Sequence, residues 1–107
     1  MSKKSADVVS VKILPNVTGN PAGKLADAEV IFEADSGPFN GMKLIGFAVW
    51  ERRGGNGRNV TFPARQYSVN GERRSFALLR PANGELNAQD AVRDLILAAY
   101  SATETQA

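Results

Sequence analysis

The chain has 107 residues, 43% of them hydrophobic, which fits one globular domain with one hydrophobic core. It contains no cysteine and no histidine, which excludes disulfides, catalytic triads built on those residues and the usual zinc sites. The formal net charge of +2 is by itself a weak indication of an anionic partner.

The amino terminus carries two lysines, but no apolar segment follows them, and no stretch is long and apolar enough to span a bilayer. We therefore expect a cytoplasmic protein with no membrane partner. We also expect a single domain over residues 1–107, with short flexible tails at about 1–6 and 102–107.

The first half of the chain predicts three strands. Val8–Leu14 alternates between apolar and polar residues, which predicts a half-exposed first strand. A loop rich in Pro, Gly and Asn follows, and Leu25–Asp35 then alternates small apolar with acidic residues, which predicts a second strand. Met42–Arg52 is nearly continuously apolar, which favours a strand in the centre of the sheet.

The second half predicts a short strand, a hairpin and a helix. Asn59–Ala64 is the short strand, and Pro63 should lie at its end because proline has no N–H for the ladder. Asn70-Gly71 predicts a two-residue hairpin turn of type I′, which needs positive φ twice. Asn87 caps a predicted helix that ends near Ser101. The apolar stripe of this helix consists of Val92, Leu95, Ile96 and Ala99.

Strands followed by one helix predict an α+β fold: an antiparallel β-sheet of four to five strands with a carboxy-terminal helix packed on one face.

The charge distribution is more informative than the total. Residues 43–80 carry eight basic and two acidic side chains, or +6, whereas the rest of the chain carries −4. All but one of the eight bases are arginines, whose guanidinium groups bind phosphate bidentately and stack on bases. Those in or beside predicted turns are Arg52, Arg53, Arg58, Arg65, Arg73 and Arg74. The turns of consecutive hairpins can gather at one end of a sheet, which would make one nucleic-acid-binding surface; the alternative is a solvated face that serves solubility.

Two other patterns have competing interpretations. The glycine-rich segment Arg53–Arg58 could cradle phosphates, but it lacks the phosphate-loop spacing and no helix follows it, which favours a turn. Asp27, Glu29 and Glu33 could do acid–base work or hold a metal. Because no nucleophile accompanies them, we interpret them as the wet face of a strand, and expect no enzyme, metal, cofactor or small-molecule substrate.

Four aromatic residues could either stack on bases or pack in the core. They are Phe47, Trp50, Phe62 and Tyr67, of which Trp50 and Tyr67 lie beside basic residues.

The order of these motifs resembles the stage V sporulation protein G (septation regulator) family over roughly residues 8 to 100. The matching segments are Phe47-Ala48-Val49-Trp50, Gly54-Gly55-Asn56-Gly57, Val60-Thr61-Phe62-Pro63, Ala64-Arg65-Gln66, Asn70-Gly71-Glu72-Arg73-Arg74, Arg80-Pro81 and Gln89-Asp90-Ala91-Val92. The resemblance implies a small homodimeric regulator that binds DNA and, in several cases, RNA. Carried over by position, the family's basic residues correspond to Arg65, Arg73 and Arg74.

A homodimer also agrees with the pattern of apolar residues, because one helix leaves the second sheet face uncovered. The residues partly off the core stripe are Ile31, Met42, Leu44 and Leu79. The rival function is a non-catalytic protein–protein interaction module that docks a partner on a sheet edge or helix face.

Overall fold

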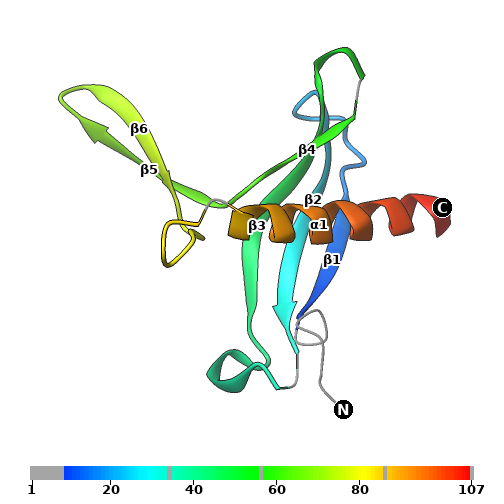
Figure 1. The fold of residues 1–107 in the computed structure, drawn as a ribbon. Helices are drawn as coiled ribbons and strands as arrows, with labels where there is room; N and C mark the ends of the chain where they lie inside the picture. The colour runs from blue at the N-terminus through cyan, green and yellow to red at the C-terminus, as the bar shows by residue number, and fades with distance from the viewer. Residues whose placement is uncertain (1–8, 34, 56, 86, 107) are drawn as a thin grey trace.

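The computed structural model describes residues 9–33, 35–55, 57–85 and 87–106. It contains a four-stranded antiparallel sheet, a separate two-stranded sheet and one long helix among these residues (Figure 1). The predicted α+β class is confirmed.

The main sheet is an antiparallel meander with strand order β1-β2-β3-β4. Its strands are β1 (Val9–Pro15), β2 (Lys24–Phe32), β3 (Lys43–Glu51) and β4 (Arg58–Thr61). Strand β3 lies between β2 and β4, as its continuous apolar sequence predicted.

One face of this sheet forms the core with helix α1 (Asn87–Gln106). The buried side chains of this core come from alternate positions of β2 and β3, from β4 and from the helix. They are Ala26, Ala28, Val30, Phe47, Val49, Val60, Ile96 and Tyr100. Figure 1 shows α1 crossing the strands on this face, and it contacts β1, β3 and β4.

The helix differs from its prediction at both ends. It continues to Gln106, beyond the expected end at Ser101, and Asn87 is its first residue rather than its cap. Within the first turns of the helix, Asp90 accepts a hydrogen bond from the Arg93 guanidinium at 2.6 Å. The guanidinium carbon of Arg93 lies 5.7 Å from the centroid of the Phe62 ring. The expected tail therefore forms helix through residue 106, and the tail at 1–6 lies outside the described residues.

The hairpin consists of β5 (Ala64–Val69) and β6 (Glu72–Ala77), which pair only with each other among the described strands. Asn70 and Gly71 connect them with φ angles of 51° and 80°, which confirms the predicted turn with two positive φ angles. The hairpin projects away from the main sheet instead of extending it (Figure 1).

The hairpin leaves the sheet at Pro63. Strand β4 ends at Thr61 and pairs only with residues 48–51 of β3, since Pro63 has no N–H to extend the ladder. Pro63 packs instead against Gly46 of β3, where an added Cβ would lie 2.9 Å from the Pro63 Cβ. The Leu78 N–H donates to the Pro63 carbonyl at 2.9 Å, which closes the base of the hairpin.

Candidate nucleic-acid interface

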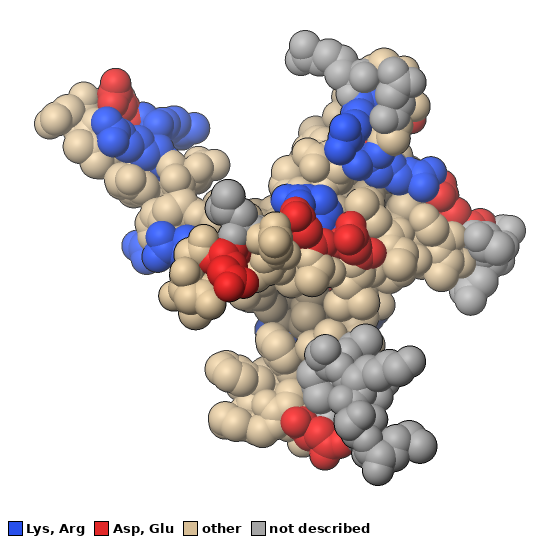
Figure 2. All heavy atoms as spheres, in the orientation of Figure 1, with Lys and Arg blue, Asp and Glu red and all other residues tan. Residues whose placement is uncertain are grey.

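The six candidate arginines lie on two separate arms of the molecule. Arg65, Arg73 and Arg74, here called the hairpin group, belong to β5 and β6. Arg52, Arg53 and Arg58, the turn group, flank the connection between β3 and β4. Figure 2 shows basic atoms gathered on the projecting hairpin and, apart from them, over the β3–β4 end of the main sheet. The expectation that consecutive turns would gather at one end of a single sheet is wrong within one chain, because the second hairpin forms its own sheet.

The strand register sorts the side chains of the hairpin onto two faces. Arg65 is paired with Phe76, and Tyr67 with Arg74. Directly paired residues of antiparallel strands share a face. We call the surface formed by Arg65, Tyr67, Val69, Glu72, Arg74 and Phe76 the Tyr67 face. The opposite surface carries Gln66, Ser68, Arg73 and Ser75, and we call it the Arg73 face.

The hairpin arginines are available to an incoming anion. Among the described residues, Arg65 and Arg73 have no hydrogen-bond or ion-pair partner, and every residue of β5 is exposed. The Nη2 atom of Arg74 lies 3.0 Å from Oε1 of Glu72, but these side chains are 55% and 69% exposed. An ion pair this exposed to solvent contributes little free energy, so a phosphate can compete with Glu72 for Arg74.

Two members of the turn group, Arg52 and Arg58, have partners within the protein. Arg58 donates from Nη2 to Oε2 of Glu104 at 2.8 Å, and its guanidinium lies 4.9 Å from the centroid of the Tyr100 ring. Arg52 donates from Nε to the Arg58 carbonyl at 3.3 Å. The side chain of Arg53 lies outside the described part of the structure. These contacts tie the β3–β4 turn to α1, so Arg58 is positioned to support the fold.

The glycine-rich segment of this turn closes on itself. The Arg52 N–H donates to the Gly57 carbonyl and the Gly55 N–H to the Arg52 carbonyl, each at 2.9 Å. These two hydrogen bonds bring Arg52 and Gly57 together across the segment, which favours the turn over the phosphate cradle.

Of the four aromatic candidates, Tyr67 alone lies on the projecting hairpin. Phe47 is fully buried, and Phe62 packs against it with ring centroids 5.3 Å apart. Trp50 is partly buried and donates from Nε1 to the Thr61 hydroxyl at 2.9 Å. Tyr67 is 41% exposed and lies beside Phe76, which is 40% exposed. Their ring centroids are 5.7 Å apart.

Sequence reasoning missed Phe76 as a site residue, although the signal was present. A two-residue turn at Asn70-Gly71 pairs Val69 with Glu72. Counting away from the turn along each strand pairs Tyr67 with Arg74 and Arg65 with Phe76, which places Phe76 on the face of Tyr67.

The acidic residues of β2 and its continuation have local partners. The Lys24 Nζ lies 2.6 Å from Oδ1 of Asp27, and the Lys43 Nζ lies 3.0 Å from Oε1 of Glu29. Glu33 lies just beyond the end of β2 and accepts a hydrogen bond from the Ser10 hydroxyl. Among the described residues, no group of three or more Asp, Glu, Cys or His is arranged to hold a metal ion.

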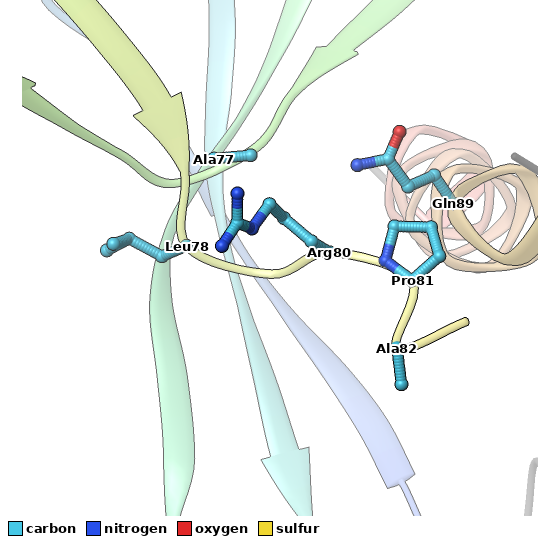
Figure 3. Close-up of a pocket in the computed structure, with 6 residues that line it drawn as sticks. All are labelled: Ala77, Leu78, Arg80, Pro81, Ala82 and Gln89. Atoms are coloured by element: carbon cyan, nitrogen blue, oxygen red, sulfur yellow. The ribbon is translucent and has the colours of Figure 1, made fainter. Parts of the chain in front are cut away.

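An open hollow of about 550 Å³ lies at the root of the hairpin, between the chain after β6 and the start of α1. Figure 3 shows its lining, in which the Arg80 side chain runs back toward Ala77 and Leu78, while Pro81 and Gln89 lie on the helix side. Among the described residues that line it, Arg80 alone is charged, and its guanidinium lies 6.0 Å from the centroid of the Phe76 ring. The hollow thus continues the basic and aromatic surface of the Tyr67 face.

Comparisons with protein-family models, curated proteins and solved structures find no match for this chain. The described residues include no helix with the length and hydrophobicity that a bilayer crossing requires.

Proposed function

We propose that this chain is a non-catalytic, nucleic-acid-binding regulatory protein, whose projecting hairpin grips the phosphates of DNA or RNA. The observation that carries the proposal is the exposed position of Arg65, Arg73 and Arg74 on an arm that otherwise bears one acidic residue, Glu72. The resemblance of the chain to the stage V sporulation protein G family favours the same function. A nucleic-acid target implies a cytoplasmic location.

The physical basis is counterion release. Each cation that neutralises a phosphate frees condensed counterions, so log K falls with log salt by about 0.9 per contact on duplex DNA and about 0.7 on single strands. Guanidinium groups suit this role because they stay charged and donate two parallel hydrogen bonds to one phosphate. Since the arm projects from the main sheet, a polyanion can approach it without displacing the core (Figure 2).

The test is fluorescence anisotropy with labelled duplex DNA, single-stranded DNA and RNA over a series of salt concentrations. Replacing all three hairpin arginines by glutamine should weaken binding and flatten the salt slope by about 0.7 to 0.9 for each arginine that contacts a phosphate, or about 1.4 to 2.7 in all for two or three contacts. The matched control is Arg52→Gln with Arg58→Gln, which removes positive charge from the other arm and should leave the slope unchanged.

Two results would contradict the proposal. If both variants flatten the slope in proportion to the charge removed, net charge drives binding and the hairpin has no special role. If the wild-type protein binds none of the three probes at low salt, the protein-interaction module is the better description.

We also propose that two copies of the chain associate. Leu44 and Leu79, expected at a partner surface, pack against the chain's own core. Met42 remains 58% exposed, and Phe39 and Ile45 beside the start of β3 are exposed to the same extent. An apolar cluster next to an unpaired stretch of strand edge is a typical site of self-association.

Light scattering should therefore give the mass of two chains for the wild type and of one chain for Met42→Glu with Ile45→Glu. Val17→Glu is the control, because Val17 is 90% exposed in a loop elsewhere, and it should stay dimeric. A wild-type mass of one chain at micromolar concentration would contradict this part of the proposal.

A further inference from the structure

We infer that the Tyr67 face of the hairpin is a stacking platform for unpaired bases, which makes single-stranded nucleic acid the preferred target. This inference rests on the nucleic-acid binding proposed above and narrows it to one class of ligand and one face of one element.

The first support is the composition of the face. Tyr67 and Phe76 lie diagonally across the two strands, with their ring centroids 5.7 Å apart and both rings about 40% exposed. Arg65 and Arg74 are the direct cross-strand partners of Phe76 and Tyr67, so each ring has a cation beside it on the same face. Proteins that bind single strands combine these two elements, aromatic rings for the bases and cations for the backbone.

The second support is the continuation of the face beyond β6. Arg80 lies over the Phe76 ring at 6.0 Å and also lines the open hollow at the hairpin root, whose other lining residues are uncharged (Figure 3). Three arginines therefore surround the ring pair, whereas Glu72 at the tip is the one carboxylate on the face and is paired with Arg74. The charge of this surface complements a phosphate backbone.

The geometry favours unpaired bases over a duplex. The two ring planes are tilted by 58° to each other, so they present their faces in different directions. In a duplex the bases are parallel and covered by their neighbours, which leaves no face for a ring without unstacking. In a single strand each base can turn separately, and two successive bases can each meet one ring.

The opposite face of the hairpin has a different chemistry. Gln66, Ser68, Arg73 and Ser75 are polar and could hydrogen-bond to base edges if the two-stranded ribbon entered a major groove. That arrangement would leave the exposed rings of Tyr67 and Phe76 without a role. The stacking arrangement uses the rings and two of the three hairpin arginines together.

The experiment compares the wild type with Tyr67→Leu, Phe76→Leu and the double variant that carries both substitutions. The probes are labelled oligothymidine and oligouridine of about 16 nucleotides and a duplex of equal length. Leucine keeps an apolar side chain but removes the ring face. Each ring lost should weaken single-strand binding by about 5- to 150-fold, while the salt slope and the duplex affinity stay unchanged. The oligothymidine and oligouridine arms differ in the 2′-hydroxyl and in the thymine methyl group, so together they show whether the platform distinguishes DNA from RNA.

Arg74→Gln and Arg73→Gln form a matched pair, because the two residues are neighbours in sequence, lose the same charge and belong to opposite faces. Arg74→Gln should flatten the single-strand salt slope by about 0.7, and Arg73→Gln should change it much less. Tyr67→Trp keeps a ring and should bind single strands at least as tightly as the wild type.

Several results would overturn the inference while leaving the proposed function intact. One is salt-dependent binding that the leucine double variant retains in full. A second is a larger loss of duplex affinity for Arg73→Gln and Gln66→Ala than for the leucine variants on single strands, which would assign the binding surface to the Arg73 face. A third is a lower mass in light scattering for the leucine variant, which would make the Tyr67 face a surface between copies. If the wild type binds no probe, the proposed function fails and the inference fails with it.

Discussion

Arg58 is the clearest test of whether a candidate arginine supports the fold or takes part in nucleic-acid binding. Its guanidinium is 2.8 Å from Oε2 of Glu104 and 4.9 Å from the centroid of the Tyr100 ring. Both partners belong to α1, so these contacts fasten the helix to the start of β4. We expect Arg58→Gln to lower stability and to leave nucleic-acid binding unchanged.

The magnitude follows from the exposure of the groups. The Arg58 and Glu104 side chains are 36% and 43% exposed, so their ion pair should contribute about 0.2 to 1 kcal/mol. A partly exposed cation–π contact adds about 0.5 to 1 kcal/mol. The variant should therefore lose about 1 to 2 kcal/mol, and each kcal/mol corresponds to a fall in Tm of about 4 to 8 °C for a domain of this size.

The assay is thermal unfolding of four proteins in a double-mutant cycle: the wild type, Arg58→Gln, Glu104→Gln and the double variant. The coupling between the two substitutions should be about 0.2 to 1 kcal/mol and should shrink at high salt, because the pair is open to solvent. The cation–π part should persist when Glu104 is already glutamine. A variant Arg58→Gln that keeps the wild-type Tm but flattens the salt slope of nucleic-acid binding would refute this reasoning.

Two further predictions concern the hairpin. Gly46→Ala should destabilise the protein by about 2 to 4 kcal/mol, because the new methyl group meets Pro63 at 2.9 Å and Gly46 has φ of 106°. Gly84→Ala is the control, since Gly84 also has positive φ but open space around it, and it should cost about 1 kcal/mol. Chemical denaturation measures both losses of stability. If Gly46→Ala loses no more stability than the control, Pro63 can shift to accommodate the methyl group at little cost. Glu72→Gln should tighten binding of single-stranded DNA severalfold, because it removes a carboxylate that repels phosphate and competes with it for Arg74. Weaker binding in anisotropy titrations would mean that Glu72 orients Arg74.

The strands of the main sheet could be predicted because their patterns are local. Ala26, Ala28 and Val30 alternate with polar neighbours, and this alternation placed them on the core face where they are buried. The end of the helix was harder to predict. Its apolar stripe becomes weak after Ala99, yet Tyr100 is buried in the core and the helix continues to Gln106.

The sequence indicated candidate arginines, but not how they are arranged in the fold. Arginines beside turns suggested phosphate contacts, and the hairpin group is exposed as that interpretation requires. The turn group has the same sequence character, but the sequence shows no sign that Glu104, far along the chain, pairs with Arg58. Contacts between distant segments depend on how the helix crosses the sheet, which local patterns do not specify.

The sequence by itself determined the hairpin and the two faces of its strands. Asn70 and Gly71 accept positive φ angles, a two-residue turn sets the register, and alternation then places Tyr67, Arg74 and Phe76 together. Only the tertiary structure decided that this hairpin projects from the main sheet. The contact between Gly46 of β3 and Pro63, which lies between β4 and β5, is at the root of the hairpin, and it forms only when segments distant in sequence pack together.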